Sequence, residues 1–201
     1  MAIVINGSGT VTGLAVGGLP DGTVDAGTLA TDSVTAAKLE ASAITGADLP
    51  AGSVLQVVQD TSTVLVSASG NTRTEILSAS ITPISTSSKI LISYHISHAS
   101  IGNEFLTYLQ RGTTDIYKYT GTDITGTERK ATTIAGAASG AWTADTESAT
   151  YLDSPSTTSS TTYSVEALAD TGTLYVNRTS GTGGTDSSGG TSTLILMEIA
   201  G

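Results

Sequence analysis

The chain has 201 residues and a formal net charge of −10, from 18 acidic and eight basic residues. Nucleic acid is bound through clustered lysine and arginine, so a scarce and scattered basic set excludes that class of partner. Without cysteine, the fold has neither disulfides nor thiolate metal sites. Aromatic residues are only 4% of the chain, whereas 36 threonines and 26 serines favour strands over helices.

The N-terminal residues do not have the pattern of a secretory signal. Met1–Ile5 lack a basic segment, and Asn6–Gly9 follow before an apolar core of sufficient length is reached. No run approaches the roughly 20 apolar residues of a membrane-spanning helix. We therefore expect neither secretion by this route nor membrane insertion.

Residues 1–50 follow a ten-residue repeat with an apolar residue at the fourth and ninth place of nearly every row. The spacing of five fits neither a continuous helix nor a strand. We expect each row to combine an extended step ending in Val or Ile with one helical turn that presents Leu. The residues predicted to line the core of this stalk are Leu14, Leu19, Val24, Leu29, Val34, Leu39, Ile44 and Leu49.

Two apolar side chains per row cannot hold such a stalk together within one chain. Fixing the backbone costs about 1–2 kcal/mol of conformational free energy per residue, whereas the burial of each apolar side chain stabilises the structure by about 1.5–3 kcal/mol. Parallel copies around a threefold axis would bring the same apolar layers together at every level. The alternative is a disordered, glycine-rich linker. The predicted organisation is attachment to a larger particle and the start of the stalk in 1–20, a trimeric stalk in 21–51 and a β-sandwich head in 52–201.

The head alternates short β-rich runs with clusters of Ser, Thr, Gly and Asp, which is typical of a sandwich or jelly roll. The predicted strands are Val54–Gln59, Thr63–Ala68, Thr74–Thr82, Ser88–Ser97, Glu104–Gln110, Asp115–Tyr119, Ala149–Asp153, Thr162–Ala167, Thr173–Asn177 and Ser192–Ile199.

Two of these strands have informative patterns. Within Ser88–Ser97, four residues are predicted to share one face: Ile90, Ile92, Tyr94 and Ile96. The last strand is almost wholly apolar, so we expect it to be buried on both faces, one option being a face against a sister subunit. The polar segment Gly181–Gly190 before it is predicted to be an exposed loop, either a hairpin connection or a contact loop.

The rows, above all Ser33–Leu39, resemble repeats of phage tail-fibre proteins. Four stretches of the head are similar to fibre-tip or virion-surface domains of phages: Ser80–Ile92, Thr150–Pro155, Leu174–Arg178 and Leu194–Ile199. The resemblance implies a homotrimeric virion protein with a jelly-roll-like head, assembled in the bacterial cytoplasm. It implies either a tail fibre that contacts a host glycan or protein, or a capsid head fibre or decoration protein; other virion proteins would bind the N-terminus.

Candidate chemistry is sparse. His95 and His98 fall on opposite faces of one strand, so they do not chelate one metal ion, although three copies of one histidine around an axis remain conceivable. There is no cysteine nucleophile and no Gly-x-Ser-x-Gly motif. A depolymerase would need two carboxylates, for which Asp145, Glu147 and Asp153 are available. We expect no enzyme activity, no cofactor and no resident metal.

Non-catalytic contact with a host surface is the remaining binding hypothesis, because exposed aromatics among polar residues make good contacts. The candidates are Trp142, Asp186, Tyr117 and Tyr119. The alternative for Tyr117 and Tyr119 is that they share one buried strand face.

Replacing Val34 and Leu39 with Asp tests the stalk. If these side chains line a threefold axis, each layer would bury three like charges, so trimerisation should weaken. Sedimentation measures the change, and unchanged trimers would show that these residues do not line the axis.

Overall fold

The computed structural model divides into two units, Met1–Thr45 and Gly46–Gly201. The residues described are 29, 31, 33–35, 37, 39, 43–69, 71–100, 104–122, 130–136, 144–179 and 188–201. Three predicted stalk residues, Leu14, Leu19 and Val24, lie outside them, as do Trp142 and Asp186. In the first unit, the side chains of Leu29, Val34, Leu39 and Ile44 are exposed. The decad stalk stays a prediction.

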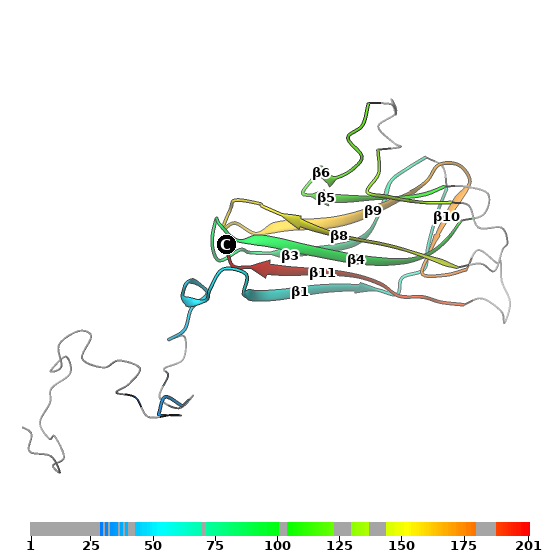
Figure 1. Ribbon diagram of the computed structural model, residues 1–201. Coiled ribbons are helices and arrows are strands. Elements are labelled where there is room, and N and C mark those ends of the chain that lie inside the picture. The colour runs from blue at the N-terminus through cyan, green and yellow to red at the C-terminus, as the bar shows by residue number, and fades with distance from the viewer. Residues whose placement is uncertain are drawn as a thin grey trace, which may run out of the picture. The chain divides into compact units, whose positions relative to one another are not determined.

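The second unit is all-β, and Figure 1 shows its strands. They are β1 (Val54–Ser62), β2 (Val66–Ser69), β3 (Thr74–Ile81), β4 (Lys89–Ser100), β5 (Phe105–Arg111), β6 (Thr114–Tyr117), β7 (Thr133–Ala135), β8 (Asp145–Asp153), β9 (Thr161–Ala169), β10 (Thr173–Val176) and β11 (Ser192–Ile199). A 3-10 turn, η2 (Gly46–Asp48), lies before β1. No helix among the described residues is long and apolar enough to cross a membrane.

The strands form two antiparallel sheets. In sheet A, β4 pairs with β8 along one side and with β11 and then β10 along the other. Strands β1 and β2 pair with β11 and β10, respectively, and complete this sheet. Sheet B has the order β3-β9-β5-β6, with β7 also on β5. The inner faces of both sheets contribute to one apolar core, which includes Ile92, Leu196, Leu77 and Tyr163.

The structure confirms the all-β fold and all ten predicted strands, with shifts of a few residues at their ends. Strand β8 begins four residues before the predicted start, and β6 ends at Tyr117 rather than Tyr119. The sequence analysis missed β7, because a three-residue strand is too short for an alternation to be recognised.

The alternation predicted in β4 is confirmed, since Ile90, Ile92, Tyr94 and Ile96 are all buried. The expectation that β11 is buried on both faces is wrong for the single chain. Its residues alternate strictly between buried and half-buried. The reason is that only sheet B lies against sheet A, and it covers only the inner face.

Part of the outer face of sheet B is covered by the chain itself. A small second core joins Leu106, Tyr108, Ala131 and Leu168 on this side. The Arg73 guanidinium lies 3.4 Å from the centre of the Tyr108 ring and 2.9 Å from the Asp115 carboxylate. This cation–π contact and ion pair fix the region of β6 against β5.

A buried asparagine organises the corner where β1 and β11 give way to β2 and β10. Asn177 has the left-handed φ of 57° and is fully buried. Its amide nitrogen donates to the carbonyl oxygens of Ser62 and Val64, both at 3.0 Å, and its amide oxygen accepts from Ser192 Oγ at 2.6 Å. Asparagine tolerates this backbone conformation, and its short amide side chain also forms hydrogen bonds with the buried polar groups of the corner.

Two substitutions separate these contributions. Asn177→Gly keeps the left-handed backbone but removes the side-chain hydrogen bonds, so we expect a loss of about 2–3 kcal/mol of unfolding free energy. Asn177→Ala should lose about 1 kcal/mol more, because alanine also strains the backbone. Urea denaturation measures both, and an alanine variant as stable as the glycine variant would contradict the backbone argument.

Candidate subunit interface

The outer face of sheet A carries an apolar row that crosses four strands. The pairing places Val57 of β1 beside Met197 of β11, Met197 beside Leu91 of β4, and Leu91 beside Leu152 of β8. Directly paired residues of antiparallel strands point to the same face, so the four side chains stand together. They point away from the core, because Ile90, Ile92 and Leu196 point into it.

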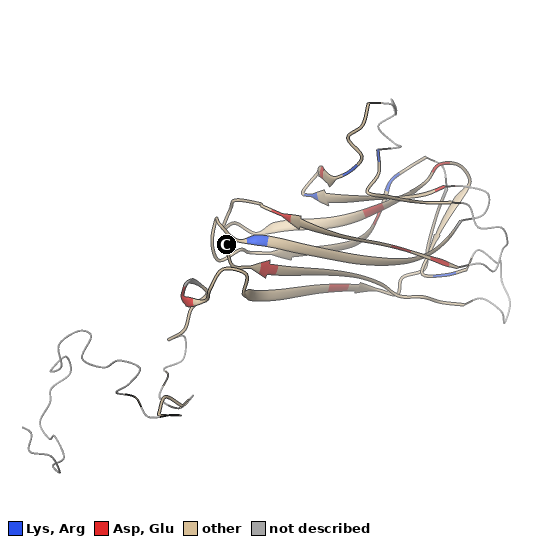
Figure 2. Cartoon of the chain, in the orientation of Figure 1, with Lys and Arg blue, Asp and Glu red and all other residues tan. Residues whose placement is uncertain are grey.

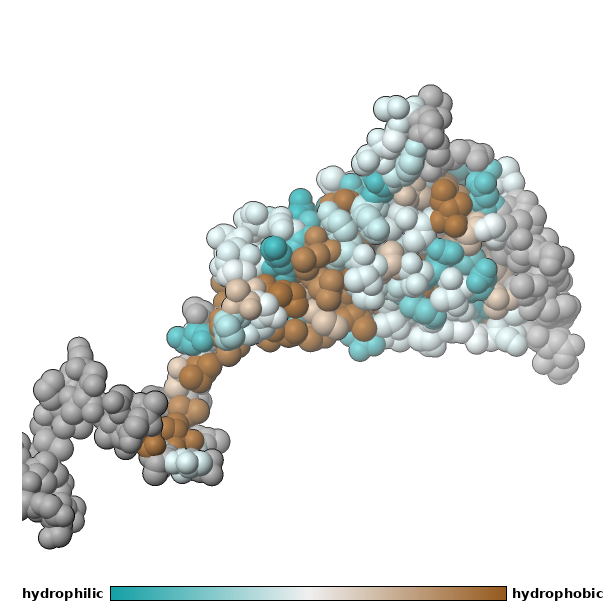
Figure 3. Space-filling model, in the orientation of Figure 1, coloured by the Kyte–Doolittle hydropathy of each residue, from teal (hydrophilic) through white to brown (hydrophobic). Residues whose placement is uncertain are grey.

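This row is open to solvent in the single chain. Val57 and Leu152, at its two ends, are 56% and 46% exposed, and the side chains of Met197 and Leu91 are half-buried. Apolar residues also gather around it on the surface, where Ile195, Ile199 and Val54 flank the row (Figure 3). A contiguous apolar patch on a soluble protein marks an interaction surface.

The same face lacks acidic residues, although the chain is strongly acidic. The four strands contain five acids, and each pairs with a residue that points inward: Asp60, Asp145, Glu147, Asp153 and Glu198. Lys89 is the one charged residue of these strands whose pairing places it on the outer face. Figure 2 shows where the acidic and basic residues lie along the strands. Two molecules that each carry −10 repel one another. A face without acids is therefore the one most suited to meet a second copy.

The chain enters the second unit at the apolar end of this face. Gly52 N donates to Ala200 O and Ala200 N donates to Ser53 O, both at 2.8 Å, so the β1–β11 ladder extends beyond Val54. In sequence, the predicted decads lead into this entry. Leu49, the last predicted stalk residue, precedes it and is exposed.

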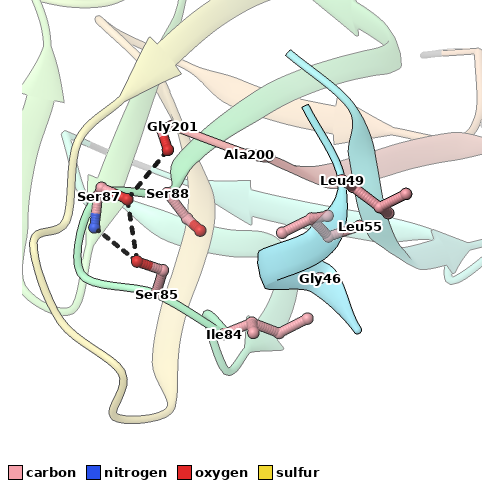
Figure 4. A pocket seen from close by; sticks show the side chains of 9 residues that line it. All are labelled: Gly46, Leu49, Leu55, Ile84, Ser85, Ser87, Ser88, Ala200 and Gly201. Atoms are coloured by element: carbon pink, nitrogen blue, oxygen red, sulfur yellow. Dashed lines mark hydrogen bonds between the residues drawn. The ribbon is translucent and has the colours of Figure 1, made fainter. Parts of the chain in front are cut away.

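A pocket of about 390 Å³ opens beside this entry. Leu49, Leu55 and Ile84 form one side of it, and the loop with Ser85, Ser87 and Ser88 forms another (Figure 4). Ser87 Oγ donates to the carbonyl oxygen of Gly201 at 3.2 Å. The described residues that line the pocket are apolar residues, glycines and three serines.

A buried carboxylate holds the pocket loop in place. Glu198 is fully buried and accepts hydrogen bonds from Gln56 Nε2 at 2.5 Å and from the Ile84 backbone N–H at 2.7 Å. Burial raises the pKa of Glu198, but these hydrogen bonds, together with the nearby polar groups of Ser88 and Ser85, outweigh the effect of burial, so the net pKa is lowered. An ionised Glu198 thus ties β1 and the loop after β3 to the end of β11.

A second buried carboxylate ties the two sheets together. Asp153, at the end of β8, accepts from Arg111 Nη1 at 2.8 Å and from the Tyr163 hydroxyl at 2.7 Å. Arg111 and Tyr163 belong to sheet B. Burial and the adjacent carboxylate raise the pKa of Tyr163, which keeps the hydroxyl protonated as a donor. Of the acids considered for a depolymerase, Asp153 is thus held in a structural contact.

The two histidines lie on opposite faces, as the alternation predicted. His95 is exposed on the outer face, whereas His98 is buried and stacks on Phe105 with ring centres 3.7 Å apart. Burial lowers the pKa of His98 to about 4, although Asp145 opposes the shift, so this ring is neutral at pH 7. Within the part of the chain that the structure describes, no three His, Asp or Glu side chains cluster as a metal site.

The tyrosine candidates are exposed rather than buried together. Tyr117 is 41% and Tyr119 38% exposed. Tyr117 stacks on Tyr151 of β8 with ring centres 4.8 Å apart, so it bridges the edges of the two sheets. Both side chains are thus partly open to solvent.

The sequence alone predicted neither the row nor the structural contacts of Glu198 and Asp153. The apolar character of β11 was the available signal, and it indicated a face against a sister subunit. The row itself depends on the register of β1, β11, β4 and β8, which are distant in sequence.

Glu198→Gln tests the role of the buried carboxylate. A lowered folded-state pKa means that the stabilisation is fully present above the ordinary value of 4.5 and is lost as the pH falls through the folded-state pKa. The variant should lose about 2–3 kcal/mol of unfolding free energy at neutral pH, and its stability should fall less steeply than that of the native chain as the pH drops below 4.5. Exposed Glu75 supplies the control Glu75→Gln. An unchanged pH profile for Glu198→Gln would refute the assignment.

No family model and no curated protein matches the chain. Among solved structures, it is similar to the VP2 subviral particle protein of infectious bursal disease virus, with 14% identity and a TM-score of 0.35. The match covers 73% of this chain and 37% of that protein, so the chain spans little more than a third of its length. A likeness of this strength carries no argument about fold or function.

Proposed function

We propose that the chain is a homotrimeric, non-enzymatic structural protein of a bacteriophage particle, a short tail fibre. The observation that carries the proposal is the acid-free outer face of sheet A with its apolar row. The row ends on the two exposed side chains of Val57 and Leu152, which a neighbouring copy would bury. Burying apolar surface between copies would stabilise the trimer by about 25 cal/mol for each Å² removed from water.

The parts of the chain divide this function between them. Residues 1–20 attach to other virion proteins, and the decads of 21–51 set the axis and register of the trimer. The jelly-roll-like head of 52–201 contacts a glycan or protein of the host surface, with Tyr117 and Tyr119 as contact residues. Three weak contacts on one trimer, multiplied over several fibres, give tight attachment through avidity.

The second candidate is a capsid head fibre or decoration protein with a purely structural role. It is favoured by the apolar row, which is a surface suited to contact between copies rather than to contact with a host. Antibody labelling of intact particles separates the two. Label on the tail is expected, and label on the capsid shell would overturn the tail-fibre proposal.

Charge on the row tests self-association. Val57→Glu with Leu152→Glu would place six like charges at the contacts of a trimer, so the double variant should dissociate at concentrations where the native chain is trimeric. The matched control is Ile134→Glu, because Ile134 is 53% exposed on β7 of sheet B.

Sedimentation velocity of the full chain and thermal unfolding distinguish the outcomes. A folded monomer for the double variant and a trimer for the control are expected. Trimers of unchanged affinity in the double variant would remove the outer face of sheet A from the interface. A monomeric native chain would contradict the proposed function itself.

A further inference from the structure

The outer face of sheet A changes character in steps along its strands. Next to the apolar row, two residues or about 7 Å further along, the paired residues are Gln59, Ile195, Ser93 and Thr150. After the same interval again they are Thr61, Thr193, His95 and Ser148. The face therefore passes from apolar, at the end where the chain enters, to polar at the other.

This gradient distinguishes parallel from antiparallel packing of two copies. In an antiparallel pair, the apolar row of one copy would lie against the polar rows of the other. Hydroxyl groups would then lose their contact with water without forming hydrogen bonds to the apolar row, which is unfavourable. In a parallel pair, apolar rows meet at one level and polar rows at another. The gradient favours copies that enter the assembly from the same end, which is also what parallel decads need.

The sides of the face differ as well. One edge strand is β1, where the row ends at Val57, and the other is β8, where it ends at Leu152. A closed ring of parallel copies joins unlike edges, because each subunit offers one side to the neighbour before it and the other to the neighbour after it. Val57 and Leu152 are the most exposed members of the row, so joining these edges buries what the single chain leaves open.

Building on the proposed function, we infer that three copies stand parallel with the outer faces of sheet A turned to the axis, so that Val57 of each copy contacts Leu152 of the next. The occupant of the face is a second copy of this chain. The interface is heterologous, and its register is set by the apolar row. The acidic side chains of these four strands point away from this face, which reduces the repulsion between acidic copies across it.

Cross-linking tests the register directly, because the natural chain contains no cysteine. The full-length variant with Val57→Cys and Leu152→Cys is treated with a short bismaleimide and, separately, with oxidised glutathione. Ring closure by unlike edges should yield covalent trimers on a denaturing gel. The matched control combines Val57→Cys with Ser148→Cys, which lies four residues along the same face of β8 and about 13 Å away. It should yield few or no trimers.

The outcomes separate the inference from the proposed function. If the native chain sediments as a trimer but the Val57–Leu152 pair does not cross-link, the inferred register is wrong while the trimer stands. Cross-linked products from the single variant Val57→Cys would indicate that the β1 edges of two copies meet each other, and this would overturn the heterologous ring. Covalent dimers from a chain that sediments as a dimer would overturn the threefold arrangement. A native monomer would contradict the proposed function.

Discussion

The second unit depends on one constraint: sheet A has two faces but only one of them is covered by the described chain. Its inner face packs on sheet B, and the outer face of sheet B is in turn covered around Tyr108 and Leu168. The outer face of sheet A keeps an apolar row at the end where the chain enters. Because the protein is acidic, a second copy that packs on this face would not meet the acidic side chains of its strands.

The buried polar groups keep this face in register. Glu198 anchors the loop after β3 at the apolar end, and Asn177 fixes the corner at the other end. Asp153 joins the edge strand β8 to sheet B through Arg111 and Tyr163. Each of these side chains points inward or is enclosed, so their charges and amides stabilise the sheet without interrupting the outer row. In the trimer that we propose, folding and assembly would use opposite faces of the same strands.

The sequence was sufficient to predict every described strand except β7, but it was insufficient to predict which strands pair. Alternation predicted the buried face of β4, and the apolar run predicted β11, because local periodicity reports which side of a strand is buried. The interactions of Glu198, Asn177 and Asp153 join residues up to 142 positions apart, so no local pattern contains them. The row from Val57 to Leu152 likewise exists only once four strands are in register. The stalk remains a prediction from its decads.

Oxidation of Met197 tests the central claim most directly, because this side chain lies in the middle of the row and is half-buried in the single chain. Mild peroxide converts an accessible methionine to its sulfoxide, and mass spectrometry of the peptide gives the rate. If the outer face of sheet A is the subunit interface, Met197 is protected in the native assembly and reacts several-fold faster once dilution dissociates it. Equal rates in the two states would contradict the account.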